Sequence, residues 1–251
     1  MILPKDIHPS WKPFFTKEVL NIVHEIQNII GIEDGEEITP FPGNMLRFLT
    51  LDLSKAKVII LGQDPYPQKG VATGRAFEVG PLKSWAESFR NTSLRNIVRA
   101  LYLSEKKELK TFKEIKKEWV SGNFLLLPPN QLFKHWEQQG VLLLNTSFSC
   151  TIGKPGSHSR YWKPFTDRLL EFINETRPEL IWFLWGNHAQ KAVEHIEIRK
   201  SFFTTHPMIC HERKNDFLFG ETNVFEVTSH LIDWTGKNEK ASSEQMQKRL
   251  W

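Results

Sequence analysis

Side chains that can move protons, position water or bind a polar ligand occur at four places in the chain, each just after an apolar segment. Asp64 lies in a Gly-Gln-Asp-Pro-Tyr-Pro segment, and Asn145 begins an Asn-Thr-Ser segment. His188 ends a Gly-Asn-His segment, and His206 precedes a proline. A carboxylate, a carboxamide and one or two imidazoles are groups from which a catalytic or binding site can be built.

The apolar segments before these residues have the length and composition of buried strands. Their apolar character is continuous, which is typical of strands covered on both faces, and they span 57–61, 141–144, 180–185 and 201–205. Apolar residues three and four apart predict helices that include 15–29, 94–101 and 165–173. We therefore predict an α/β fold in three layers, a central four-stranded, mostly parallel sheet with helices on both faces. Because ligands bind beyond the carboxyl ends of such strands, the four polar residues should converge on one rim.

Each of these residues also has a purely structural interpretation. An Asp before a proline is a good turn residue, as Asp64 is here, and Asn145 could simply begin a turn. His188 has the position of a residue in the first turn of a helix. Their convergence at the ends of several strands favours the functional interpretation.

The composition is that of an ordinary folded protein. The 251 residues are 40% hydrophobic and 25% charged, which argues against a disordered or fibrous chain. We see neither a linker nor an internal repeat, so we predict one domain over 1–234 and an extension at 235–251 that is mobile or forms a short helix. The net charge of +4 and an isoelectric point near 9.0 are compatible with a polyanionic partner.

The chain shows no signal-peptide pattern and no apolar segment long enough to span a bilayer, so no membrane partner is expected. We expect an intracellular, cytoplasmic protein, or a nuclear or mitochondrial one in a eukaryote. Cys150 and Cys210 are too few for a disulfide framework or a Cys-rich zinc site. No metal-binding cluster is visible in the sequence, and neither a metal nor an organic cofactor is expected.

Short motifs in a fixed order give the chain a specific resemblance over nearly its full length. They read Ile-His-Pro-Ser-Trp-Lys at 7–12, Gly-Gln-Asp-Pro-Tyr-Pro at 62–67, Gly-Arg-Ala-Phe-Glu-Val at 74–79, Thr-Ser-Leu-Arg-Asn-Ile at 92–97, Gly-Val-Leu-Leu-Leu-Asn-Thr at 140–146, Gly-Ser-His-Ser at 156–159, Trp-Gly-Asn-His-Ala-Gln-Lys at 185–191, His-Pro at 206–207 and Ile-Asp-Trp at 232–234. Together they resemble the family-1 uracil-DNA glycosylases. The resemblance implies a monofunctional N-glycosyl hydrolase that flips uracil out of DNA, releases the free base and leaves an abasic site, initiating base-excision repair.

By this resemblance the catalytic residues are Asp64 and His206. Cleaving the bond between uracil and deoxyribose makes the sugar cationic and the departing base anionic. Asp64 would orient the attacking water and stabilise the sugar cation. His206, as a neutral imidazole, would donate a hydrogen bond to uracil O2.

The resemblance also assigns four residues to the uracil pocket. Asn145 would pair with the N3–H and O4 of uracil and reject cytosine, in which both groups are reversed. Tyr66 would exclude the C5 methyl group of thymine, and Phe77 would stack on the flipped base. Gln63 would line the floor of the pocket.

DNA contacts are expected from three residues that match the loops of the family that meet phosphate groups. These residues are Ser93, Ser157 and His158. In the segment 62–67, Pro67 replaces the His that most members carry, which removes a polar contact to DNA.

The segment after His206 departs from the family pattern His-Pro-Ser-Pro-Leu-Ser, whose Leu fills the space of the flipped nucleotide. Simple counting puts Cys210 at the Leu position, whereas Met208 and Ile209 are the larger apolar side chains. Arg213 is a candidate to replace the missing serine contact to a phosphate. The intercalating loop is thus predicted to be divergent.

Two other classes of function remain open at this point. One is a non-catalytic DNA-binding accessory subunit on the glycosylase fold, and the other is a superfamily glycosylase of broader base specificity. For the favoured class we expect a monomer whose partner is uracil-containing DNA, single- or double-stranded. An inhibitor protein that mimics DNA is a further candidate partner.

Overall fold

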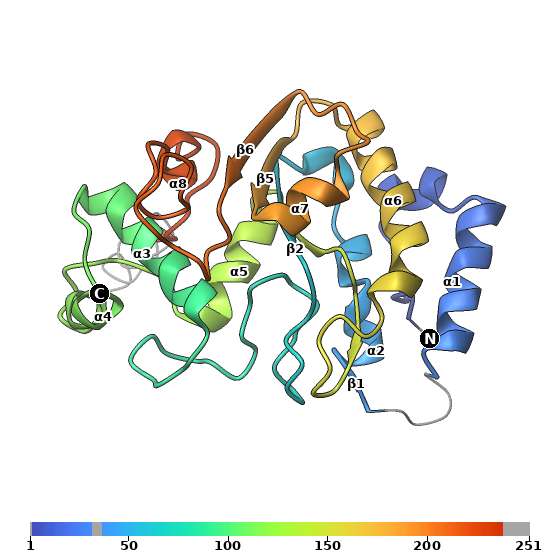
Figure 1. Ribbon diagram of the computed structural model, residues 1–251, viewed down its shortest axis with the longest axis horizontal. Coiled ribbons are helices and arrows are strands. Elements are labelled where there is room, and N and C mark those ends of the chain that lie inside the picture. Colours follow the sequence, from blue (N-terminus) through green and yellow to red (C-terminus); the bar gives the residue numbers. More distant parts are fainter. Residues whose placement is uncertain (1, 32–36, 238–251) are drawn as a thin grey trace, which may run out of the picture. The chain divides into compact units, whose positions relative to one another are not determined.

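The computed structural model describes residues 2–31 and 37–237. These residues group into two compact units, and each is considered by itself. The first unit comprises the chain up to Pro81 together with Gly140–Thr204, and the second comprises Leu82–Gln139 and the residues from Thr205 onward. Figure 1 shows the helices and strands with the labels used below.

The first unit is built on a four-stranded parallel sheet in the order β3-β2-β5-β6. The strands are β2 (Val58–Gly62), β3 (Val141–Asn145), β5 (Ile181–Trp185) and β6 (Lys200–Thr204). All residues of β2 and β3 are buried, as their continuous apolar sequences predict. The register places Gly62 opposite Asn145, so both strands end at the same level.

Two long helices of the first unit pack on each other and on one face of this sheet. They are α1 (Lys17–Ile29), which begins at the capping side chain of Thr16, and α6 (Ser159–Thr176). Their apolar stripes share one core with the strand residues that face them, including Ile59, Leu142 and Leu184. The residues of β2 and β3 that point to the opposite face are buried as well.

Shorter elements complete the first unit. A second sheet pairs β1 (Ile38–Thr39) antiparallel with β4 (Cys150–Thr151). The short helices are α2 (Pro42–Met45), α7 (Asn187–Ala192) and three 3₁₀ turns, Pro9–Phe14, Arg47–Thr50 and Leu53–Lys55.

The second unit is mainly helical. It contains α3 (Thr92–Lys106), α4 (Phe112–Val120), α5 (Pro129–Gln138) and α8 (Val224–Val227), and α3 packs against both α4 and α8. A capping box formed by Thr111 and Glu114 fixes the start of α4.

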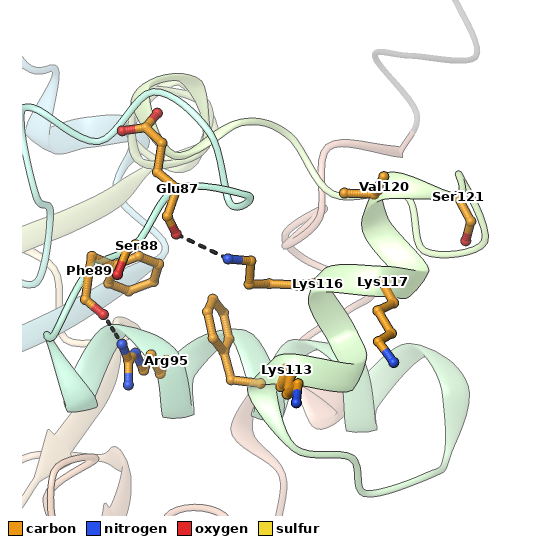
Figure 2. A pocket seen from close by; sticks show the side chains of 10 residues that line it. Glu87, Ser88, Phe89, Arg95, Lys113, Lys116, Lys117, Val120 and Ser121 are labelled. Atoms are coloured by element: carbon orange, nitrogen blue, oxygen red, sulfur yellow. Dashed lines mark hydrogen bonds between the residues drawn. The ribbon is translucent and has the colours of Figure 1, made fainter.

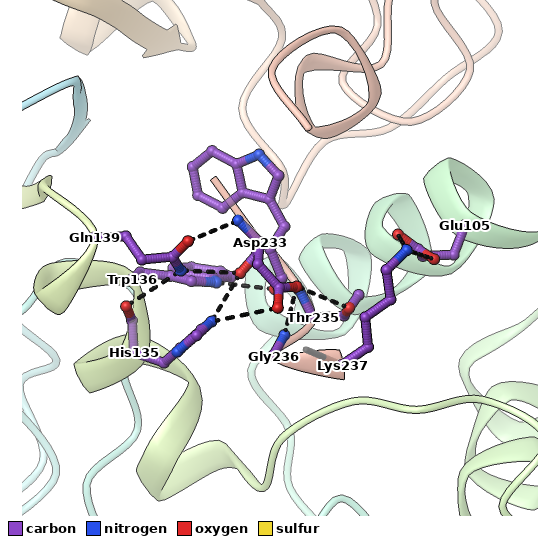
Figure 3. A network of polar contacts seen from close by, with 9 residues as sticks. Glu105, His135, Trp136, Gln139, Asp233, Thr235, Gly236 and Lys237 are labelled. Atoms are coloured by element: carbon purple, nitrogen blue, oxygen red, sulfur yellow. Dashed lines mark hydrogen bonds and ion pairs between the residues drawn. The ribbon is translucent and has the colours of Figure 1, made fainter. Parts of the chain in front are cut away.

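A polar network fastens the end of α5 to the segment around Asp233 (Figure 3). The Asp233 carbonyl lies 3.0 Å from both His135 Nε2 and Gln139 Nε2, and the Asp233 amide donates to Gln139 Oε1 at 2.7 Å. The indole of Trp136 donates to the Trp234 carbonyl at 2.9 Å. The Ile-Asp-Trp motif at 232–234 is therefore part of the framework of this unit.

The predicted α/β class, with a four-stranded parallel sheet flanked by helices, is confirmed. Each predicted strand agrees with the structure to within one residue at either end. The single domain over 1–234 stays a prediction, and most of the predicted extension, 238–251, lies outside the described residues. In the described part of the chain, no helix combines the length and apolarity needed to cross a membrane.

Candidate active site

Asp64 lies two residues beyond the end of β2, at the carboxyl edge of the sheet. Its Oδ1 accepts a hydrogen bond of 3.1 Å from the hydroxyl of Ser159, the first residue of α6. Burial raises the pKa of the Asp64 carboxyl, and the Ser159 hydrogen bond, the charge of His188 and a hydrogen bond from Gln63 oppose that increase. Asp64 is thus a partly buried carboxylate with donors arranged around it.

Asn145 is the last residue of β3 and is only 5% exposed. Its carboxamide makes no hydrogen bond to a residue that the structure describes, although buried polar groups normally have a partner. The absence of a side chain at Gly62 creates the space it occupies, because a Cβ at Gly62 would lie 2.4 Å from Asn145 Oδ1. This pairing leaves an amide with unused donors and acceptors beside the Asp64 segment.

Tyr66 and Phe77 lie on neighbouring loops of the same unit. The Tyr66 hydroxyl reaches the Phe77 carbonyl at 3.5 Å, and the Phe77 ring lies 5.2 Å from that of Trp185 at the end of β5. Phe77 has a φ of 66°, which is a strained conformation for an aromatic residue. Such strain costs of order 1–3 kcal/mol and is concentrated at functional sites.

A buried ion pair holds the loop that carries Phe77. Arg75 Nη1 lies 2.8 Å from Glu78 Oε2, and both side chains are almost fully buried. The hydroxyl of Thr73 donates to the same carboxylate oxygen. Gly74 at φ 86° has no room for a side chain, since a Cβ there would lie 1.9 Å from the Asn44 carbonyl. The Arg75–Glu78 ion pair and the close packing at Gly74 therefore hold the loop in which Phe77 has its strained backbone conformation.

His188 lies near Asp64, as the ends of the strands predict. Its Nε2 is 2.7 Å from the hydroxyl of Thr146, which also donates to the Gln63 carbonyl. Burial lowers the pKa of His188, the Asp64 carboxylate raises it, and Lys191 lowers it. A cavity of about 390 Å³, lined in part by Thr146, Ser159 and His188, opens beside these groups.

The link between Ser159 and Asp64 is one that sequence reasoning missed. The two residues are 95 positions apart, and Ser159 stood out in the sequence only as the last residue of a Gly-Ser-His-Ser match. A hydroxyl at the start of a helix has no sequence signature that identifies its partner.

His206 belongs to the second unit and follows the end of β6 by two residues. Its Nδ1 accepts a hydrogen bond of 3.1 Å from the Met208 amide, so this nitrogen carries no proton in that arrangement. The proton of a neutral ring is then on Nε2. The backbone carbonyl of His206 accepts a further bond from the Ile209 amide at 2.8 Å, which closes a tight turn.

The side chains after His206 differ in exposure. Met208 is 58% exposed and Ile209 is 52% exposed. Cys210, in contrast, is turned inward, with its sulfur 3.4 Å from Asn96 Nδ2 and 3.4 Å from the Pro207 carbonyl. Of the three predicted wedge candidates, two therefore form the exposed apolar tip and Cys210 packs beneath it.

Asp216 ties the two ends of this segment together. It is 1% exposed, and its carboxylate accepts from the Thr205 hydroxyl and the His211 amide on one oxygen and from the Leu218 and Phe219 amides on the other. Burial raises the pKa of Asp216, but these donors outweigh burial and lower it overall. The segment from Thr205 to Phe219 is thus closed around one carboxylate.

The predicted DNA contacts occupy different environments. Ser93 lies in the first turn of α3, where helix amides can bind a phosphate, and Arg213 is exposed. The hydroxyl of Ser157 accepts from the Thr151 amide at 2.9 Å. His158 is only 4% exposed, and its ring lies 2.9 Å from the Ser149 hydroxyl and 3.2 Å from that of Thr151. The His158 side chain is therefore packed inside the first unit and does not have the exposure that a DNA contact requires.

A separate cavity of about 630 Å³ lies in the second unit (Figure 2). Phe89 and Phe112 contact edge to face, and Arg95 lies over both rings. Lys116 donates to the carbonyls of Ala86 and Glu87. The cavity has aromatic walls and a basic rim. Among the described residues of both units, no cluster of His, Cys, Asp or Glu is arranged to hold a metal ion.

Comparisons with known proteins agree on one family. A family model described as the uracil DNA glycosylase superfamily matches residues 50–244. The chain is 34% identical over 242 residues to a uracil-DNA glycosylase of Pseudomonas aeruginosa, a match that covers 91% of this chain and 94% of the relative. The crystal structure of mimivirus uracil-DNA glycosylase is 26% identical, with a TM-score of 0.63 over 82% of this chain and 70% of that chain. A mimivirus UNG variant in complex with UGI, 23% identical, has a TM-score of 0.65 over 95% and 86% of the two chains.

Proposed function

Because the chain belongs to the uracil-DNA glycosylase superfamily, we propose that it excises uracil from DNA by hydrolysing the N-glycosidic bond. The products are free uracil and an abasic site, so the reaction initiates base-excision repair. The observation that carries this function is the buried Asn145 carboxamide, which has unused hydrogen-bonding groups at the strand end nearest to the Asp64 segment.

Asp64 is the residue that serves the sugar side of the reaction. As the bond breaks, the sugar gains oxocarbenium character, which an adjacent carboxylate stabilises. The same carboxylate orients the attacking water. Asp64 must therefore be ionised in the reactive complex, against the effect of its partial burial.

Asn145 selects the base. A carboxamide offers one acceptor and one donor side by side, which match the N3–H and O4 of uracil. Cytosine presents the opposite pair and would leave both groups of a buried amide unpaired, which can discriminate by about 10⁴-fold.

Tyr66 and Phe77 shape the rest of the pocket, with Gln63 at its floor. Tyr66 occupies the space that the C5 methyl group of thymine would need, and its hydroxyl contact with the Phe77 backbone supports that position. Phe77 stacks on the extruded base, a contact worth about 1–3 kcal/mol.

His206 serves the base side of the reaction. Because Nδ1 accepts the Met208 amide, a neutral ring carries its proton on Nε2 and donates from that nitrogen. A donor of this kind, aimed in advance at the oxygen where charge develops, is worth about 10²–10³ in rate. This arrangement supports the neutral imidazole and does not require a protonated ring.

The finer assignment is to family 1 with a divergent DNA-intercalation loop. Met208 and Ile209 supply the apolar wedge, because they are the exposed large apolar side chains next to His206 in that loop. Ser93 and Arg213 contact phosphate groups of single- or double-stranded DNA. The UGI complex of the mimivirus variant supports an inhibitor protein as a further partner.

The test uses purified full-length protein and oligonucleotides that carry one uracil, single- or double-stranded, with thymine and cytosine controls. Released uracil and alkali-labile abasic sites are measured in EDTA. We expect activity in the wild type and its loss in the Asp64→Asn, His206→Ala double variant. Absence of uracil release at high protein concentration would refute the function and favour a non-catalytic DNA-binding subunit.

A further inference from the structure

We infer that Ser159 is a positioning residue for Asp64: its hydroxyl holds one carboxylate oxygen and leaves the other for the attacking water. This inference rests on the proposed function, which assigns the water and the sugar cation to Asp64. The Ser159 hydroxyl lies 3.1 Å from Asp64 Oδ1.

The two oxygens of the Asp64 carboxylate have different surroundings. Oδ1 accepts from Ser159, whereas Oδ2 faces Gly156, where an added Cβ would be 4.0 Å away. Gly156 contributes no side chain, so it leaves room beside Oδ2. Gln63 also donates to this carboxylate, with a smaller effect than Ser159. The Ser159 contact at Oδ1 restricts rotation of the carboxylate plane, so that Oδ2, beside Gly156, can accept from water.

Ser159 is itself held rigidly. Its amide donates to the Gly156 carbonyl at 3.1 Å, and the preceding His158 is buried between two hydroxyls. One turn later the Trp162 indole donates to the Ser149 hydroxyl at 2.8 Å. Hydrogen bonds thus hold the start of α6 on both sides of Ser159. The fixed backbone places the Ser159 hydroxyl next to Asp64.

The other groups that face Asp64 favour its ionised form less than Ser159 does. Pro67 in its own loop has no donor, and burial lowers the pKa of His188 on α7, which favours the neutral ring. Burial also raises the pKa of Cys150 on β4 to about 11, so this thiol stays neutral. Among the groups that lower the pKa of the Asp64 carboxyl, the Ser159 hydroxyl has the largest effect, followed by the charge of His188 and then the hydrogen bond from Gln63. Removing Ser159 should therefore make Asp64 harder to ionise and less well oriented.

The test compares Ser159→Ala, Ser159→Thr and the matched control Ser54→Ala on a single-stranded uracil oligonucleotide across the pH range. Ser54 is a suitable control because its hydroxyl donates to Asp52 at 2.6 Å, the same kind of contact away from the site. We expect Ser159→Ala to lower kcat about tenfold with KM nearly unchanged, since a hydrogen bond to a charged group is lost. Its acid limb should move to higher pH, Ser159→Thr should recover both properties, and Ser54→Ala should match the wild type.

A second readout follows the Asp64 carboxyl directly by NMR titration in the wild type and in Ser159→Ala. We expect a higher Asp64 pKa in the variant. The inference would be overturned if Ser159→Ala and the wild type had the same kcat and the same acid limb. It would also be overturned if Ser159→Ala lost kcat equally at every pH, with an unchanged Asp64 titration and no recovery in Ser159→Thr. An inactive wild type with a shifted Asp64 titration would instead remove the proposed function and leave the contact intact.

Discussion

Gly62→Ala should disable the uracil pocket by displacing Asn145, although Gly62 itself is assigned no contact with the substrate. The new Cβ would lie 2.4 Å from Asn145 Oδ1 and 3.1 Å from Ala76 Cβ. To restore an ordinary contact the carboxamide has to retreat by about 1 Å, and a misplacement of that size at a reacting or binding group costs about 10²-fold in rate. We therefore expect kcat/KM on a uracil oligonucleotide to fall about 100-fold.

The same crowding should lower the stability of the fold to a smaller extent. Overpacking of a buried site costs about 1–3 kcal/mol, or a few degrees in Tm for a chain of this size. Gly43→Ala is the matched control, because its nearest contact would be an ordinary 3.9 Å. In the Gly62→Ala, Asn145→Ala double variant the clash with the carboxamide is absent and only the 3.1 Å contact with Ala76 remains, so the stability loss should be less than additive. If Gly62→Ala keeps kcat/KM within threefold of the wild type, the Asn145 geometry described above does not control uracil binding.

Further outcomes follow from the same site. Tyr66→Ala should release thymine from a T-containing oligonucleotide that the wild type leaves intact. If the variant also releases no thymine, Tyr66 is not the group that excludes the C5 methyl. Asn145→Asp should raise the ratio of cytosine to uracil excision, measured by competition between the two oligonucleotides; an unchanged ratio would count against base selection by the carboxamide. Replacing Met208 and Ile209 together by alanine should lower kcat/KM for uracil excision from duplex DNA about tenfold, while excision from single-stranded DNA stays nearly unchanged. An equal loss on both substrates would contradict the wedge role of these side chains. Asp216→Asn should lower the free energy of unfolding by about 3 kcal/mol at neutral pH. Folding lowers the pKa of Asp216 below 3.8, so the extra stability of the wild type should be present above that pH and should disappear as the pH falls through the lower pKa of the folded state. A difference in urea denaturation that does not depend on pH would contradict this.

The sheet and the polar residues at its edge could be predicted from the sequence, because each strand is determined by its own short apolar segment. Continuous apolar segments of four to six residues form strands that are buried on both faces, and parallel strands carry their next residues to one edge. The amino-acid sequence alone is therefore enough to place Asp64 and Asn145 at the ends of β2 and β3.

The remaining features depend on contacts between distant residues. The space at Gly62 is meaningful only once the register sets it opposite Asn145, and the Ser159 contact joins the β2 end to α6 across 95 residues. The motifs predict that Cys210 and His158 meet the DNA, but Cys210 contacts Asn96 and is only partly exposed, and His158 is buried between hydroxyl groups.

Because Asp216 closes the loop, the sequence of the loop tip can change independently of the position of His206. The side chains between His206 and His211 can change while the Asp216 carboxylate keeps Thr205 and the His211 amide together and His206 stays next to Thr205. The proposed DNA contacts of the tip can therefore change without disturbing His206, the proposed hydrogen-bond donor. Because the loop ends are held in place, other sequences can be substituted at the tip. The resulting variants can be screened for a changed preference between single- and double-stranded DNA.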